Sequence, residues 1–291
     1  MIQLGFNIVF MAMKLLLISL SFSVIYHPTK FFHLAHAAII TAAAYFVFLF
    51  SRQLEMSLWF SIPLGVLCAT VIGLFCEICL YKPLRKRNSS PMILMIASLG
   101  LYTVLQNAIS IIWGDNTQRI RIGEIKTGYD FWGAYITTIQ VITIVVCLLF
   151  FIATLLFLKY HKIGRDIRAV ASNLELSNIM GIHSDKVILW AFGLGSSLAA
   201  IVGILIAFDV NMTPTMGFNW LLYGVVAMII GGIGSNWGLI GGALLLAISQ
   251  HVVAYYLGSQ WMDAIAYVIL ILFLIWKPLG FSGKRLKKVE I

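Results

Sequence analysis

Long apolar stretches separated by short polar connections run along almost the whole chain. Each has roughly 16–25 residues, and about 20 apolar residues are needed for a helix to cross the hydrocarbon core of a membrane. The pattern predicts nine helical segments, at approximately 4–26, 34–50, 58–81, 91–113, 134–158, 187–209, 218–233, 238–257 and 261–276. Two of them, 34–50 and 218–233, are short enough to be broken or re-entrant, so we expect about eight or nine spans.

The connection between the fifth and sixth segments, about 159–186, contains a different pattern. Residues 164–182 are polar enough to lie outside the membrane, and their apolar positions have a helical period. The apolar stripe carries Ile167, Val170, Ala171 and Leu174, and the polar stripe carries Arg168, Ser172 and Glu175. Because Gly181 suits the end of a helix, the stretch predicts one water-exposed amphipathic helix.

Composition supports a membrane protein. Of 291 residues, 61% are apolar and 11% are charged, whereas a soluble domain has roughly 25% charged residues. We therefore predict an all-α, polytopic integral membrane bundle that forms a single transmembrane domain over 1–291. The net charge of +9 does not indicate nucleic acid binding, because the basic residues cluster between the apolar segments.

The basic residues also predict the orientation. If all nine segments cross, 15 of the 20 Lys and Arg residues fall on one face: Lys30, Lys82, Arg85, Lys86, Arg87, Lys159, Lys162, Arg165, Arg168, Lys186, Lys277, Lys284, Arg285, Lys287 and Lys288. The other face has Arg52, Arg119, Arg121 and Lys126. The positive-inside rule then places the N-terminus outside and the C-terminus in the cytoplasm.

Tryptophan is the second signal, because amphipathic rings prefer the membrane interface. All eight lie at or near a segment end: Trp59, Trp113, Trp132, Trp190, Trp220, Trp237, Trp261 and Trp276. The two signals agree on where the segments end.

A few polar residues lie inside the apolar segments, where they are costly unless they face a bundle interior or a water-filled cavity. Lys14 is in the first segment, and a functional role, snorkelling toward an interface or a contact with a partner subunit would each explain it. His33 and His36 precede or open the second segment, and Gln106 and Asn107 lie in the fourth. Hydrogen bonds between helices and the lining of a solute path both remain open for these four.

Glycines frame the connection between the seventh and eighth segments. They are Gly231, Gly232, Gly234, Gly238, Gly241 and Gly242, in the sequence GGIGSNWGLIGG. Small residues allow helices to approach closely in lipid, so the pattern favours close packing of a helical hairpin. A hinge beside a translocation path is the compatible functional alternative.

Common enzymatic and phosphate-binding motifs are missing. The chain has no GxxxxGK[ST], HExxH or GxSxG sequence. Four cysteines lie in apolar segments, and the Cys76–Cys79 pair lacks the second pair or nearby histidine of a zinc site. We therefore predict no metal site and no cofactor on this chain.

Six blocks together resemble the branched-chain amino acid ABC permease family, in particular its LivH-type subunit. They are HLAHA at 33–37, EICLYKPLR at 77–85, Gln106, GRDIRAVASN with MGI at 164–182, Pro214 and Gly217 with GGIGSNWGLIGG, and KPLGFSG at 277–283. They occur in the family's order across about 250 residues. The order makes the resemblance more specific than any single block.

The resemblance implies a permease in a bacterial inner membrane that imports branched-chain or other hydrophobic amino acids by alternating access. The implied partners are two ABC ATPase subunits, which would hold ATP and magnesium, a second permease subunit (LivM-like, or a second copy), and an extracytoplasmic solute-binding protein. The loop at 159–186 would dock on the ATPase. The implied coupling residues are Gly164, Arg165, Arg168, Ala169, Glu175, Gly181 and Ile182.

Other functions remain open at this point. Within the family, the solute could be urea, a short amide or a sugar. A secondary transporter or channel would need no ATPase, and a coupled transporter should have charges near the membrane midplane. An integral membrane enzyme would need a catalytic cluster, which the sequence does not show.

Overall fold

The computed structural model describes residues 2–121, 128–131 and 133–281, and helices occur at all nine predicted positions. Predicted features at Lys126, Trp132, Lys284, Arg285, Lys287 and Lys288 lie outside these ranges. The helices are α1 (Ile2–Thr29), α2 (His36–Phe48), α3 (Leu58–Cys76), α4 (Lys82–Lys86), α5 (Pro91–Trp113), α6 (Thr138–Tyr160), α7 (Lys162–Ser172), α8 (Leu174–Ile179), α9 (Ser184–Asp209), α10 (Met216–Gly231), α11 (Asn236–Leu257) and α12 (Met262–Trp276). Two short strands, β1 (Tyr129–Phe131) and β2 (Ala134–Ile136), pair antiparallel.

Seven helices of the described chain are long and apolar enough to cross a membrane. One is continuous from Leu58 to Lys86, because a π-helical turn at Glu77–Tyr81 joins α3 to α4. The other two predicted segments are α10, with 16 residues, and α2, with 13 residues extended by a π-helical turn at Leu49–Gln53. These are the two segments, 34–50 and 218–233, that were predicted to be short enough to be broken or re-entrant. The chain is a multi-pass helical membrane protein.

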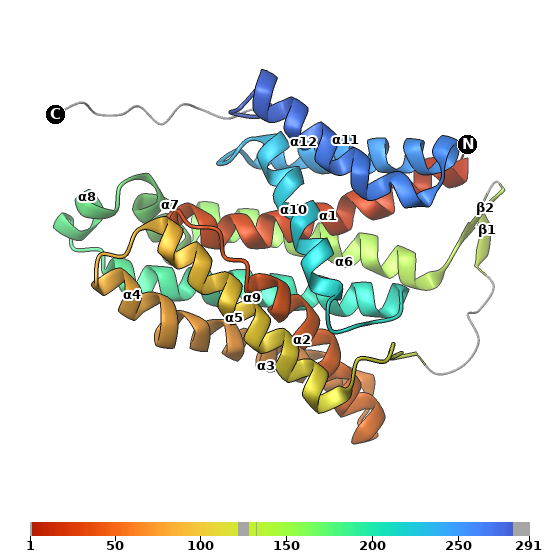
Figure 1. Ribbon diagram of the computed structural model, residues 1–291, viewed down its shortest axis with the longest axis horizontal. Coiled ribbons are helices and arrows are strands. Elements are labelled where there is room, and N and C mark those ends of the chain that lie inside the picture. Colours follow the sequence, from red (N-terminus) through yellow and green to blue (C-terminus); the bar gives the residue numbers. More distant parts are fainter. Residues whose placement is uncertain (1, 122–127, 132, 282–291) are drawn as a thin grey trace.

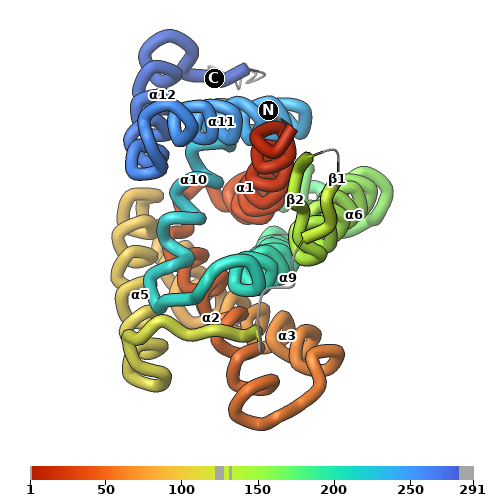
Figure 2. Tube along the Cα trace, turned by 90° about the vertical axis from the view of Figure 1, so that its right-hand side faces the viewer, coloured from red at the N-terminus to blue at the C-terminus, as the bar shows by residue number. Residues whose placement is uncertain are grey.

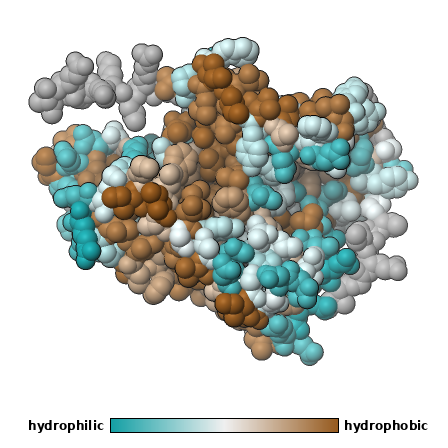
Figure 3. Space-filling view, in the orientation of Figure 1, coloured by the Kyte–Doolittle hydropathy of each residue, from teal (hydrophilic) through white to brown (hydrophobic). Residues whose placement is uncertain are grey.

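Helix α1 lies at the centre of the bundle, surrounded by α6, α9, α10 and α11 (Figures 1 and 2). A helix that is apolar on all sides is suited to such a position, and most of α1 from Phe10 to Ile25 is buried. Helices α3, α5, α6 and α12 lie outside and expose many apolar side chains, some of which form brown areas on the face in Figure 3. Such exposed apolar surface suits contact with lipid or with another membrane subunit.

The chain turns back into the bundle between α1 and α2. His36, the first residue of α2, bonds to Ser21, which is eight residues before the end of α1. At 1.5 Å per residue, α2 therefore starts about 12 Å inside the end of α1. The non-helical residues Phe31, His33 and Ala35 are fully buried in protein. Irregular backbone at membrane depth needs such shielding, so the second segment is partly re-entrant.

The structure corrects the start of the fifth segment. Residues 134–136 form β2 rather than helix, and α6 begins at Thr138. Thr137 N donates to Gln140 Oε1 (3.0 Å), which satisfies a backbone group at this start. Tyr135 N in β2 also donates to Gln3 Oε1 (2.8 Å), which ties the hairpin to the beginning of α1. The fold is therefore helical apart from one small hairpin.

The described ends of the chain lie at opposite ends of the bundle (Figure 1). The start of α1 lies beside the hairpin. Phe281 N donates to Ile230 O (2.9 Å) at the end of α10, which lies near the end of α1. An odd number of crossings produces this arrangement.

Close helix packing gives a test of the fold. A Cβ added at Gly203 of α9 would overlap the carbonyl oxygen of Ile40 in α2, whereas a Cβ at Gly100 of α5 would meet nothing within 4 Å. We expect Gly203→Ala to lower the free energy of unfolding by roughly 1–3 kcal/mol. Gly100→Ala should leave it unchanged or raise it by up to about 1 kcal/mol, because alanine is the better helix former.

Unfolding of both variants in the same detergent measures the difference. Equal stability of the two alanine variants would contradict the close contact between α2 and α9.

Candidate functional site

Two histidines and their partners form a polar cluster in the core. His33 Nδ1 lies 3.0 Å from Tyr81 Oη and 3.4 Å from Ser98 Oγ, and His36 Nε2 lies 3.1 Å from Ser21 Oγ. The two imidazole rings are 5.4 Å apart, and neither side chain has exposed surface. Ala35 N donates to Ser98 Oγ (2.9 Å), so the cluster also satisfies the re-entrant backbone. We name these residues the histidine cluster.

Both histidine side chains of the cluster are fully buried in this structure, and each has one ring nitrogen without a hydrogen-bond partner among the described residues. His33 Nε2 and His36 Nδ1 are buried and have no partner among the described residues. Each buried unpaired polar atom costs roughly 1–3 kcal/mol. Such atoms suit either a water molecule or a group that reaches them in another conformation of the bundle.

Gln106 and Asn107 are not part of the histidine cluster. Both are on α5, two turns beyond Ser98; Gln106 is half-buried, and Asn107 is exposed and donates to the Thr103 carbonyl of its own helix (2.7 Å). Of the four polar residues that the sequence singled out, the structure therefore brings together only His33 and His36. Tyr81 and Ser98 were not predicted as partners, because only the fold brings the π-helical turn and α5 to the re-entrant stretch.

Residues of the EICLYKPLR block contribute both to the histidine cluster and to a group of ion pairs. Tyr81 enters the histidine cluster, and Arg85 pairs with the buried Glu77, with Arg85 Nη1 2.9 Å from Glu77 Oε2. Lys82 and Arg85 also approach Asp185 in the first turn of α9, each at 3.8 Å. Glu77 is the first residue of the π-helical turn and Arg85 lies eight residues later, so their ion pair spans the turn. The approach of Lys82 and Arg85 to Asp185 holds the turn beside α9.

Lys14 forms an ion pair that the sequence did not predict. Its Nζ lies 3.0 Å from Asp209 Oδ2 at the end of α9, and 3.9 Å and 4.7 Å from the ring centroids of Phe10 and Trp220. The Lys14 side chain is 4% exposed, and that of Asp209 is 18% exposed. The pair lies near the middle of α1, so Lys14 does not snorkel. Trp220, near the start of α10, packs against this charge.

The glycine-rich connection between α10 and α11 brings the backbones of these two helices into direct contact. Gly231 of α10 and Gly238 of α11 face each other so closely that a Cβ on either would overlap the other's carbonyl oxygen, and Gly242 meets Ala227 O in the same way. Gly232 and Gly234 have φ of +95° and +99°, which side chains rarely adopt. Gly241 is different, because its nearest neighbour is the Phe281 ring at 3.8 Å. This geometry is what close packing of a hairpin needs.

The predicted amphipathic helix is two helices rather than one. Asn173 is extended, with φ of −153°, and separates α7 from α8; its Oδ1 accepts a hydrogen bond from Leu176 N (3.0 Å) and caps α8. Gly181, with φ of +83°, follows α8 as a helix-ending residue should. The single helix over 164–182 was therefore wrong at Asn173, because a polar side chain that caps a new helix ended the first one.

The two helices differ in what they contact. In α7, Gly164, Ile167 and Val170 are buried, and α7 packs on α1, α6 and α9. In α8, the apolar side chains point outward: Leu174, Leu176, Ile179 and the following Met180 are 39%, 56%, 81% and 75% exposed. Figure 1 shows α8 projecting beyond the bundle. We call these four residues the α8 patch.

The remaining predicted coupling residues lie along this segment. Arg165 and Glu175 are exposed, and Ala169 and Ile182 are half-buried. Arg168 is exposed but turns back toward the bundle, where its Nη2 donates to the Lys159 carbonyl at 3.2 Å. Arg165 and Arg168 therefore do not have the same surroundings.

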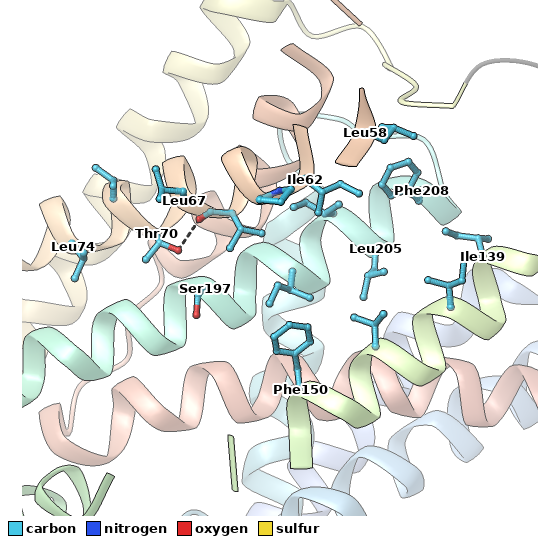
Figure 4. Close-up of a pocket in the computed structure, with 17 residues that line it drawn as sticks. Leu58, Ile62, Leu67, Thr70, Leu74, Ile139, Phe150, Ser197, Leu205 and Phe208 are labelled. Atoms are coloured by element: carbon cyan, nitrogen blue, oxygen red, sulfur yellow. Dashed lines mark hydrogen bonds between the residues drawn. The ribbon is translucent and has the colours of Figure 1, made fainter. Parts of the chain in front are cut away.

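A large apolar groove lies on another face, between α3, α6 and α9. Its volume is about 1010 Å³, and its lining includes Leu67, Phe150 and Phe208 (Figure 4). Thr70 and Ser197 are the hydroxyl residues in its wall, and Thr70 donates to a carbonyl of its own helix (2.7 Å). Among the described residues, no group of three or more His, Cys, Asp or Glu side chains could hold a metal ion.

Comparison with known proteins gives one consistent result. A family model described as "Branched-chain amino acid transport system / permease component" matches residues 4–274. The chain is 29% identical to the high-affinity branched-chain amino acid transport system permease protein LivH of Escherichia coli K12, covering 97% of this chain and 96% of that protein. It is also 29% identical to BraD of Pseudomonas aeruginosa, a permease protein of the same described function, over 92% and 91%.

One solved structure has a similar fold. A chain of PsaBC from Streptococcus pneumoniae in complex with Fab superposes with a TM-score of 0.52. The match covers 92% of this chain and 90% of that one at 13% identity, so it supports the fold alone.

The Lys14–Asp209 pair leads to a test by double substitution. Lys14→Met removes the partner of a mostly buried carboxylate, and we expect the free energy of unfolding to fall by roughly 3–5 kcal/mol. Adding Asp209→Leu should restore most of that loss, because the unpaired charge is gone. The unfolding of the two single variants and the double variant in one detergent measures the coupling. Additive losses would show that the two side chains do not depend on each other.

Proposed function

The chain belongs to the branched-chain amino acid transport system permease family, and we propose that it is the permease subunit of an ABC importer in a bacterial inner membrane. The observation that carries this proposal is the family match over 4–274, together with a multi-pass bundle that corresponds to the whole match. The proposed solutes are branched-chain or other hydrophobic amino acids. Urea, short amides or sugars are the alternatives within the same architecture.

We assign the end of the bundle that carries α7 and α8 to the cytoplasm. Basic residues gather at this end, among them Lys82, Arg85, Lys159 and Arg165, which supports the assignment by the positive-inside rule. The N-terminus then lies outside and the described C-terminal end lies inside. An extracytoplasmic binding protein would deliver solute beside the β1–β2 hairpin, at the outer end.

We assign the ATPase contact mainly to the α8 patch. Exposed apolar side chains next to polar ones are typical of a protein interface, and α8 extends beyond the membrane-facing helices. Arg165 and Glu175 lie on the same exposed segment and supply polar contacts. The buried side of α7, with Ile167 and Val170, transmits movement of α8 to α1 and α9. ATP and magnesium would be held by two such ATPase subunits.

The solute path is proposed to pass the histidine cluster when the bundle changes its opening. The unpaired nitrogens of His33 and His36 support this, because they can form hydrogen bonds with a solute in the buried core. Gln106 and Asn107 would line an outer part of the path, on a face of α5 that is partly exposed in the single chain. A second permease subunit covering that face would complete the wall.

A secondary transporter remains the competing function. The buried Lys14–Asp209 pair is the kind of midplane charge that ion coupling uses. The family match favours an ATP-driven importer, and the presence or absence of an ATPase in the active transporter decides between them.

The α8 patch provides a first test. We expect Ile179→Glu with Met180→Glu to reduce co-purification of the ATPase at least about tenfold, since buried carboxylates without partners weaken an interface. Lys162→Glu, an exposed change at the start of α7, is the control for added negative charge. Pull-down from membranes that contain all subunits measures the contact. Full ATPase recovery with the double variant would contradict the assignment, and full transport without any ATPase would exclude an ABC importer.

The solute class is tested on the assembled transporter in proteoliposomes. With the ATPase, the second permease subunit and the binding protein present, uptake of labelled leucine should depend on ATP and should exceed uptake of labelled urea by at least about tenfold. His36→Ala, which keeps α8 unchanged, should reduce uptake more than it reduces ATPase co-purification. ATP-dependent urea uptake without leucine uptake would assign the chain to the alternative solute.

A further inference from the structure

A second cavity lies at the cytoplasmic end of α1 and is separate from the histidine cluster. It has a volume of about 1280 Å³ and is formed by the last turns of α1, the second half of α6, α7, the α10–α11 connection and the residues after α12. Figure 2 shows α1 lying between α6 and α11, and these two helices form the sides of the cavity. We call it the α6–α11 cavity.

The polar part of this cavity is basic. Lys30, Lys159 and Arg168 line it together with His27, and no described Asp or Glu is among the lining residues. His27 Nε2 is buried and has no partner among the described residues. These groups lie within the cytoplasmic interface region of the proposed orientation, where the headgroups of the inner leaflet lie.

The rest of the lining is apolar and reaches the outer surface of the spans. Leu148, Ile152 and Leu156 of α6 are 41%, 47% and 51% exposed, and Trp237 at the start of α11 is 82% exposed. The cavity therefore opens sideways between two membrane helices and not only toward water. Trp237 lies where an amphipathic ring marks the membrane interface.

We propose that the α6–α11 cavity binds one anionic phospholipid of the inner leaflet. Its phosphate contacts Lys30, Lys159 and Arg168, and its acyl chains run along α6 and α11. The charges match because three basic side chains line the polar part, and the apolar part matches the chains. Free phosphate would use the basic groups and leave the apolar lining uncovered. The proposal depends on membrane insertion and the orientation, but not on which solute is carried.

The position of this site gives the lipid a role beyond anchoring. Arg168 and Ala171 of α7 and Gly234 of the glycine connection line the same cavity. A lipid there touches both the helix that carries α8 and the hairpin α10–α11. It therefore fills the space between α7 and the α10–α11 connection.

The test compares lipids on the intact permease. We purify the chain in nanodiscs of phosphatidylcholine alone or with phosphatidylglycerol, and measure bound lipid by native mass spectrometry and the melting temperature. Wild type should retain one phosphatidylglycerol in preference to phosphatidylcholine and melt at a higher temperature with it. Lys30→Gln and Lys159→Gln should each weaken this preference roughly fivefold.

Lys186→Gln is the matched control, because it removes one exposed charge at the same end of the bundle outside the cavity lining. Leu155→Trp is the second variant, since a larger ring in the apolar part should displace the acyl chains and leave the basic groups in place. Both substitutions leave the α8 patch intact, so ATPase co-purification reports separately on the proposed function.

Three results would overturn the lipid site. The first is equal retention of the two lipids by wild type. The second is stabilisation by inorganic phosphate alone that matches phosphatidylglycerol, which would assign the basic groups to a free anion. The third is a cross-link from cysteines at Leu156 and Trp237 to a second permease subunit in the assembled transporter, which would show that protein fills the cavity.

Discussion

Inside a bilayer, each peptide N–H and C=O has to find its partner within the protein, because no water is available to replace it. The whole bundle reflects this constraint, and its effect is clearest where the chain leaves helical geometry between α1 and α2. There the backbone at Ala35 uses Ser98 of α5, and His33 fills the adjoining space with Tyr81 of the π-helical turn. Two elements distant in sequence, α5 and the π-helical turn, thus support the six non-helical residues between α1 and α2, which fixes α2 at its depth inside the bundle.

The sequence predicted the helical segments well because the membrane imposes a simple rule of length and hydrophobicity. It identified α2 and α10 as the short helices, and the glycines at 231 and 238 as sites of close approach. It could not predict that residues 134–136 pair as a strand, since an apolar strand of three residues has no period that distinguishes it from the start of a helix. Asn173 was misjudged for a related reason, because a helix-capping asparagine and a surface asparagine look alike in one sequence.

Partnerships between distant residues were beyond the sequence for a different reason. Lys14 stood out as a charge in a span, but Asp209 looked like an ordinary residue at the end of another. Their contact depends on the depth at which α9 ends beside α1, and hydropathy does not determine relative depth. The same applies to the histidine cluster, in which Tyr81 and Ser98 are 48 and 65 residues from His33.

Helices α1 and α9 are linked at two places. At the end of the bundle where α1 ends and α9 begins, α7 packs on both through Ile167 and Val170, and near the middle of α1 Lys14 pairs with Asp209 at the end of α9. Because the two contacts lie at different positions along the helices, neither helix can tilt without the other. In the proposed importer, a movement of α8 that α7 transmits therefore reaches α1 and α9 together. The two helices thus act as one unit, and a change at either contact alters the position of both.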